Sequence, residues 1–193
     1  LVDAVKRVDP EAGDELLNYI LGNTEAGKLY RLYEAYRRNY GLIRAISDSM
    51  HYDLKALIQD TLRNSDLLDT LKKVLPSNDA EKLFNTLLAG KEREVEEALI
   101  DLANKGVISR SNATVLIENV RQTWRKVLPL VDADKALWDL TGDVGSVFNL
   151  VQNGDLGGLK TLPANLRSTL DRLLEDLGKA RDAGLITDAM YNE

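Results

Sequence analysis

Apolar side chains recur every three or four residues along much of this chain. From Tyr52 onward, Leu54, Leu57, Ile58 and Leu62 follow this spacing, which places them on one face of an α-helix. No run shows the sustained two-residue alternation, rich in valine, isoleucine and threonine, that is typical of a half-buried strand. The sequence therefore predicts an all-α fold, a compact multi-helix bundle of about eight to ten helices with short loops and antiparallel neighbours.

Helix start and stop signals divide the N-terminal part of this pattern. Asp9 followed by Pro10 is typical of a helix start, and Gly22 predicts the end of that helix. Thr24 is expected to begin a second helix, which Gly41 closes. The residues from 42 to 50 would then form a short helix or a turn, followed by the amphipathic helix that starts near Tyr52.

Similar signals continue further along the chain. Asn78 with Glu81 resembles a capping box, and Ser109 or Ser111 is expected to open a helix that Pro129 ends. Closely spaced glycines between residues 142 and 162 interrupt the pattern. We predict a main helical bundle over 1–141, a glycine-rich connecting region over 142–162 and a C-terminal helical hairpin over 163–193 packed on the bundle. A single domain is the alternative.

Composition removes several kinds of chemistry. The 193 residues include no cysteine, which excludes disulfides, thiolate nucleophiles and cysteine-based zinc sites. The single histidine, His51, excludes metal sites built on paired histidines. With 44% apolar residues the chain can bury a core of its own, in which Trp124 and Trp138 are expected to be anchors. We predict no cofactor and no bound metal, and no small-molecule substrate is evident.

The remaining candidates for catalysis are local clusters. His51 lies between Asp48 and Asp53 and close to Ser49, a set that could be drawn as an acid–base site. No spacing among these residues defines a triad, so the pattern favours a surface histidine at a helix junction and a protein that is not an enzyme. Four aspartates lack the order of a calcium-binding loop, and the first two are better interpreted as candidate helix N-caps. They are Asp132, Asp134, Asp139 and Asp143.

Charge is distributed unevenly along the chain. The net charge is -6, but residues 28–44 contain five basic side chains and one acidic one, a local charge of +4 that leaves -10 on the remainder. Such a division indicates either a local anion site or two surfaces that attract each other between subunits. Four tyrosines of this segment fall on one side of a helix, with Arg31 and Arg38 pointing away from them.

This basic segment has three interpretations. It could be an amphipathic helix with a solvated basic back, a protein interface rich in tyrosine and arginine, or a platform on which single-stranded nucleic acid stacks. We rank the protein interface above nucleic acid because the whole chain is acidic. The residues predicted to bind a partner are Tyr30, Arg31, Tyr33, Arg37, Arg38, Tyr40 and Arg44.

One turn pattern occurs twice, in residues 99–109 and 177–187. In each copy a glycine ends a helix, two apolar residues follow, and Ser109 or Thr187 caps the next helix. The second copy, with Gly184, Leu185 and Ile186 and then Tyr191, resembles the short C-terminal domain family known as SHOCT. The resemblance covers about the last twenty residues, and it implies a small helical hairpin that serves oligomerisation or docking.

The first copy has a second interpretation, since a turn followed by an apolar helix is similar to a DNA-reading helix–turn–helix. The basic residues that would support it, Arg121, Arg125 and Lys126, lie far from the start of that helix, and the preceding helix begins with four glutamates. The pattern favours a structural hairpin.

The function that the sequence favours is binding of other proteins or self-association, as a structural or scaffold subunit of a virion, a filament or another complex. The alternative is nucleic-acid binding through residues 28–44. No run approaches the length of a membrane span, and no signal-peptide pattern opens the chain. We expect a soluble protein, cytoplasmic by default, although a chain that begins at Leu1 is open to interpretation as processed or as a fragment.

Overall fold

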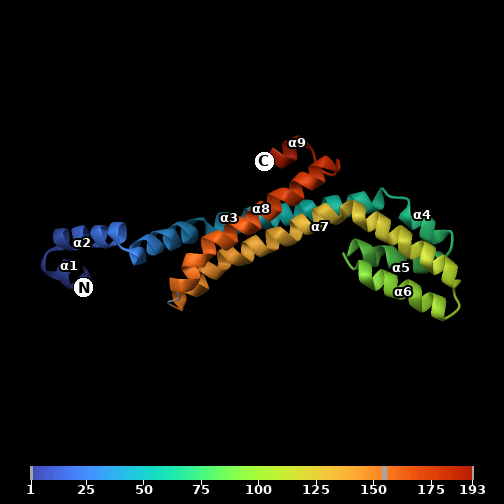
Figure 1. Ribbon diagram of the computed structural model, residues 1–193, viewed down its shortest axis with the longest axis horizontal. Coiled ribbons are helices and arrows are strands. Elements are labelled where there is room, and N and C mark those ends of the chain that lie inside the picture. Colours follow the sequence, from blue (N-terminus) through green and yellow to red (C-terminus); the bar gives the residue numbers. More distant parts are fainter. Residues whose placement is uncertain (1, 154–155, 193) are drawn as a thin grey trace. The chain divides into compact units, whose positions relative to one another are not determined.

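The computed structural model describes residues 2–153 and 156–192, and all of its regular structure in these ranges is helical (Figure 1). This confirms the predicted all-α class and the predicted number of helices. The helices are α1 (Val2–Val8), α2 (Pro10–Asn23), α3 (Glu25–Arg63), α4 (Leu67–Lys72), α5 (Ser77–Leu88), α6 (Glu92–Asn104), α7 (Arg110–Gln152), α8 (Leu156–Asp182) and α9 (Asp188–Asn192).

The chain divides into two compact units. Unit 1 comprises Leu1–Ser49 and Leu137–Leu170, and unit 2 comprises Met50–Ala136 and Asp171–Glu193. The three long helices α3, α7 and α8 each contribute residues to both units. The boundaries expected from the sequence, at residues 142 and 163, fall inside α7 and α8.

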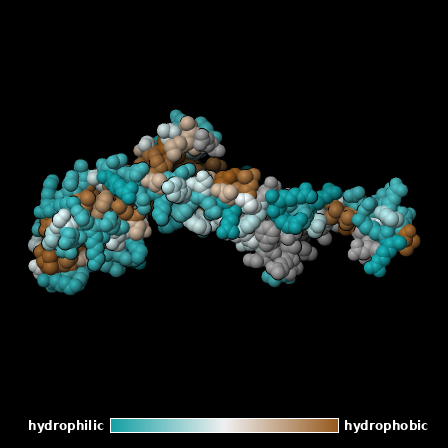
Figure 2. All heavy atoms as spheres, turned by 180° about the vertical axis from the view of Figure 1, so that it is seen from behind, coloured by the Kyte–Doolittle hydropathy of each residue, from teal (hydrophilic) through white to brown (hydrophobic). Residues whose placement is uncertain are grey.

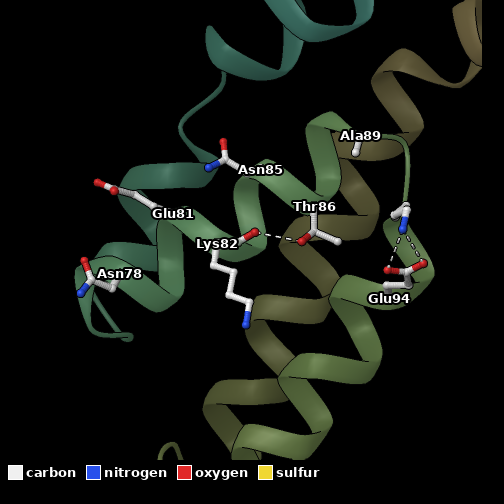
Figure 3. Close-up of a pocket in the computed structure, with 8 residues that line it drawn as sticks. Asn78, Glu81, Lys82, Asn85, Thr86, Ala89 and Glu94 are labelled. Carbon is white, nitrogen blue, oxygen red and sulfur yellow. Dashed lines mark hydrogen bonds and ion pairs between the residues drawn. The ribbon is translucent and has the colours of Figure 1, made fainter.

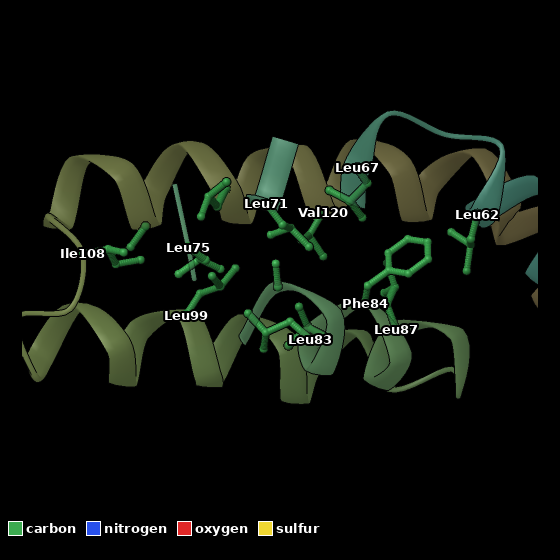
Figure 4. Packing of buried hydrophobic residues seen from close by; sticks show 14 of the residues in the cluster. Leu62, Leu67, Leu71, Leu75, Leu83, Phe84, Leu87, Leu99, Ile108 and Val120 are labelled. Carbon is green, nitrogen blue, oxygen red and sulfur yellow. The ribbon is translucent and has the colours of Figure 1, made fainter. Parts of the chain in front are cut away.

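Unit 2 contains the main hydrophobic core, which α4, α5, α6, the end of α3 and the first part of α7 build together (Figure 4). Leu62, Leu71, Leu99, Leu116 and Val120 are completely buried. Full burial of one such side chain stabilises a fold by about 1.5–3 kcal/mol. The three- and four-residue spacing that predicts these helices is therefore the spacing that fills this core.

Unit 1 begins with two helices whose junctions follow the predicted signals. The Asp9 carboxylate accepts hydrogen bonds from the backbone N–H groups of Glu11 and Ala12, at 3.0 and 3.1 Å. At the start of α3 the Thr24 hydroxyl accepts a hydrogen bond from the Gly27 N–H at 2.9 Å. Both N-caps satisfy donors that a helix start leaves without intrahelical partners.

Several predicted helix ends are wrong. Gly41 lies inside α3, and Pro129, Gly142 and Gly145 lie inside α7, whereas α2 ends at Asn23, within one residue of Gly22. A glycine inside a helix costs only about 1 kcal/mol, so flanking residues that pack well can carry the helix through it. The helix α7 also continues through Pro129, because Val127 and Leu130 on either side of it are completely buried.

Three predicted N-caps and one predicted core residue also need correction. Pro76, and not Asn78, precedes the first residue of α5, while Asp132 and Asp134 lie within α7. Trp138 is 54% exposed and so is no core anchor, whereas Trp124 packs partly buried against the core of unit 2. Gly157 and Gly158 belong to α8, and Gly154 lies outside the described residues.

Candidate functional site

The basic segment of residues 28–44 forms the middle of α3 within unit 1. Tyr30 is 51% exposed. Tyr40 is half-buried, and its hydroxyl oxygen lies 3.7 Å from the position that a Cβ would take on Gly145. The side chains of Tyr33 and Tyr36 lie outside the described residues, so the predicted tyrosine stripe stays a prediction.

The arginines of this segment fall into two groups. Arg37 pairs with Glu34 at 3.1 Å, and Arg44 lies 4.0 Å from Asp48. Arg31 and Arg38 are exposed, and within the described ranges neither has an acidic partner. Internal ion pairs therefore engage two of the predicted arginines and leave the other two available to an external anion.

Arg31 and Arg38 share a helix face with two exposed aliphatic side chains. Leu42 is 61% exposed and Ile46 is 50% exposed. At 100° per residue, all four positions fall within about 80° of one another. We call these four residues the α3 seam. The helix face that the sequence predicts to be solvated and basic therefore has arginines in its first half and aliphatic side chains in its second half.

Sequence reasoning missed Leu42 and Ile46 because it ended the helix at Gly41. The signal is present, since Leu42 and Ile46 lie four and eight residues after Arg38. This spacing becomes visible once the helix is allowed to pass through the glycine. A methyl group in place of a Gly41 hydrogen would have no neighbouring atom within 4 Å, so this glycine marks no close approach of another helix.

The second predicted basic cluster lies on α7 and is partly occupied. Arg121 donates two hydrogen bonds to the Glu96 carboxylate of α6, from Nε at 2.6 Å and from Nη2 at 2.7 Å. The hydrogen bond from Arg121 holds the pKa of Glu96 below its usual range, whereas burial raises the pKa of neighbouring Glu92. Arg125 and Lys126 are exposed.

This bond also fixes the geometry of the first repeated turn. Glu96 lies before the turn at Gly106 and Arg121 lies well after it, and the bond between them holds α6 and α7 side by side and antiparallel (Figure 1). A DNA-reading helix–turn–helix crosses at about 90–120°. The segment is the structural hairpin that the sequence favours.

The glycine turn occurs three times in the described chain, and the repeated sequence pattern covers two of these turns. Gly90, Gly106 and Gly184 have φ of 82°, 74° and 72°, the left-handed conformation that glycine adopts most readily. After Gly106 and Gly184, Ile108 and Ile186 are both buried to 7% exposure. The residue directly after Gly106 does not pack in the same way, since Val107 is 49% exposed.

The caps after two of these turns form as predicted. Ser109 accepts a hydrogen bond from the Asn112 N–H at 3.0 Å, and Thr187 accepts one from the Met190 N–H at 3.2 Å. In the C-terminal hairpin the Arg181 guanidinium lies 4.4 Å from the centre of the Tyr191 ring. This cation–π contact closes α9 against the end of α8.

The closest acidic contact of His51 comes from another helix and not from its sequence neighbours. Its Nδ1 lies 2.5 Å from Oδ1 of Asp134 on α7, a residue 83 positions away. The pair lies at a cavity of about 240 Å³ whose apolar wall includes Ile58, Leu88 and Trp124. The contact between His51 and Asp134 joins α3 to α7 within unit 2. In the described ranges no group of three potential metal ligands is found.

A second hollow lies over α5 and α6 (Figure 3). It is wide and shallow, with a volume of about 570 Å³. Three of its charged side chains are already paired, since Lys91 contacts Glu94 at 3.2 Å and Glu81 contacts Lys72 at 2.8 Å. This pairing leaves little free charge with which the hollow could hold an ionic ligand.

Comparison with known proteins yields no match among family models, curated proteins or solved structures. Among the described helices, none combines the length and apolar character that crossing a membrane requires. Among the candidate surfaces, the α3 seam combines charge unpaired within the described ranges, at Arg31 and Arg38, with exposed apolar side chains.

Proposed function

We propose that this chain is a non-enzymatic protein-interaction subunit that acts through helix–helix contacts, as a structural or scaffold component of a larger assembly. One observation carries the proposal. Arg31 and Arg38, without acidic partners in the described chain, share a helix face with Leu42, which is 61% exposed. A face that served only solubility would not need large aliphatic side chains beside its arginines.

The composition of the α3 seam suits a protein partner. Arginine is enriched at interfaces, where its guanidinium forms paired hydrogen bonds with carboxylates. Burial of Leu42 and Ile46 against a partner would gain about 25 cal/mol for each Å² of apolar surface removed from water. Because both lie on a continuous helix, little backbone order would be lost on binding.

The C-terminal hairpin is the second contact surface that we propose. Leu174 on α8 and Met190 on α9 are 45% and 44% exposed, both within unit 2. The resemblance of this hairpin to the SHOCT family supports docking or oligomerisation and stays a prediction.

A photocrosslinking amino acid in place of Leu42 tests the proposal in cells that produce the protein. The matched control places the same amino acid at Arg37, which is exposed on the opposite side of α3. We expect polypeptide adducts from position 42 and far fewer from position 37. Equal yields at the two positions, or no adduct with protein at position 42, would contradict the proposal.

Nucleic-acid binding is the second candidate function, because Arg31 directly follows the half-exposed Tyr30 on α3 and Arg38 lies further along the same helix. Stacking on the tyrosine and phosphate contacts from Arg31 and Arg38 would give an affinity that falls steeply with salt. The Arg121 side chain contributes less to such a surface, since Glu96 already binds it. A gel-shift series with single- and double-stranded DNA and RNA at low salt tests this candidate, and the absence of any shift would eliminate it.

A further inference from the structure

We propose that the α3 seam of one copy binds the outer face of α6 on a second copy, so that copies join head to tail. This inference rests on the proposed function and names its partner. The partner surface is the α6 strip, which we define as Glu97, Ile100 and Asp101.

Opposite charge is the first argument for this pairing. Residues 28–44 have a net charge of +4, and α6 has five acidic side chains and one arginine, a net charge of -4. Charge complementarity of this kind directs association and fixes register. Within the described ranges Arg31, Arg38 and Glu97 form no ion pair of their own, so these three charges can pair across the contact.

The exposure of the α6 strip is the second argument. Val95 and Leu99, on the inner face of α6, are 1% and 0% exposed, whereas Ile100 is 49% exposed. Glu97 has no cationic partner within the described ranges. Asp101 pairs with Lys105 at 2.6 Å, but both side chains are more than half exposed, and such surface pairs are weak and exchangeable.

Both surfaces combine unpaired charge with an exposed aliphatic side chain in the same order along the helix. On α3, Arg38 precedes Leu42 by four residues, and on α6, Glu97 precedes Ile100 by three. At 1.5 Å per residue these separations are about 6 and 4.5 Å. With the helices parallel, an ion pair between Arg38 and Glu97 and an apolar contact between Leu42 and Ile100 can therefore form together.

The same charges argue against symmetric pairing. Two seams face to face would place arginine against arginine, and two α6 strips would place Glu97 against Glu97. Arg93, which shares the outer face of α6, does not reverse the sign, because Glu97 and Asp101 carry two negative charges against its one positive charge. The pairing is heterologous, and heterologous contacts generate rings or open filaments.

Charge reversal on each surface tests the inference with the full chain. The seam variant is Arg31→Glu with Arg38→Glu, and the strip variant is Glu97→Arg with Asp101→Arg. Analytical ultracentrifugation over a range of protein concentrations measures the average mass, and circular dichroism verifies that each variant keeps its helix content. We expect the mass of the unmodified protein to rise with concentration and to fall toward the monomer as salt is added.

We expect each variant alone to stay monomeric at concentrations where the unmodified protein associates, because one variant has two acidic surfaces and the other has two basic ones. An equal mixture of the two is expected to associate again, since each seam then meets an oppositely charged strip. The controls, Lys135→Glu and Glu118→Arg, reverse exposed charges on α7, outside both surfaces, and should associate like the unmodified protein.

A mixture that stays monomeric would overturn the inference, as would variants that associate normally on their own. An unmodified protein that remains monomeric at every concentration would overturn it as well. The proposed function is judged separately, because crosslinking of position 42 to a different polypeptide would support a protein interface while excluding a second copy as its partner.

Discussion

The two ends of α3 use one amphipathic pattern for different purposes. In unit 2, Leu54 and Leu62 are 5% and 0% exposed, whereas in unit 1, Leu42 and Ile46 are 61% and 50% exposed. The space-filling view likewise shows brown, hydrophobic atoms at the surface among teal ones (Figure 2). Periodicity identifies a face that is suited to burial. It does not distinguish burial within the chain from burial against a partner.

The first prediction compares two leucines. Replacement of Leu99, which is 0% exposed, by alanine should lower the free energy of unfolding by about 2–5 kcal/mol, because it removes apolar contacts and leaves a cavity. Replacement of Leu42, which is 61% exposed, should change it by at most about 0.5 kcal/mol. Urea unfolding followed by circular dichroism in dilute protein measures both values. A comparable loss at Leu42 would show that the α3 seam is covered within the chain.

The second prediction compares a glycine that ends a helix with one that lies inside a helix. Gly106 has a φ of 74°, so Gly106→Ala should cost about 1–2 kcal/mol. Gly41 lies inside α3 with no neighbour within 4 Å, so Gly41→Ala should stabilise the helix by about 0.5–1 kcal/mol. Hydrogen exchange of α3 and α6 measures the local effects. If Gly41→Ala lowered the hydrogen-exchange protection of α3, this would indicate that the helix ends at Gly41, as the sequence suggests.

These glycines show how far the sequence predicts the fold. The helical class, the core spacing of unit 2 and the ends at Gly90, Gly106 and Gly184 follow from local physical chemistry. Gly41 and Gly142 carry the same local signal but lie inside helices. The sequence could not separate the two cases, because packing elsewhere decides whether a helix continues through a glycine that costs it about 1 kcal/mol.

The third prediction compares a serine and an asparagine that the sequence suggests as N-caps. Ser109 accepts the Asn112 N–H at 3.0 Å, so Ser109→Ala should lower the free energy of unfolding by about 1 kcal/mol. Asn78 is the second residue of α5 and makes no cap, so Asn78→Ala should have an effect near zero. Chemical unfolding of both variants measures the difference. Equal losses would mean that Asn78 caps α5 in solution.

Candidate sites are less predictable than helices, because they depend on residues far apart in the chain. The pairs Arg37–Glu34 and Arg44–Asp48 are three and four residues apart, so helical spacing alone could have predicted them once α3 was known to continue past Gly41. By contrast, the sequence draws attention to His51 for its nearby aspartates, whereas its partner is Asp134 on another helix. Pairing across the fold determines which charges stay available to a partner, and one sequence without structure contains no direct signal for it.

The last and smallest expected effect concerns the ion pair that joins α6 to α7 in unit 2. The pKa of Glu96 is lowered by its hydrogen bond with Arg121, so this carboxylate stabilises the folded state above its unfolded pKa of about 4.3. That contribution is lost as the pH falls through the lower pKa of the folded state. The raised pKa of Glu92 acts in the opposite sense, because its protonation in acid favours folding.

Glu96→Gln should therefore make the acid-side loss of stability shallower, while Glu97→Gln, which removes no ion pair within the described ranges, should leave it unchanged. Thermal unfolding in dilute protein from neutral to acidic pH measures both slopes, and identical slopes for the Glu96→Gln variant and the unmodified protein would show that this bond does not hold the hairpin together.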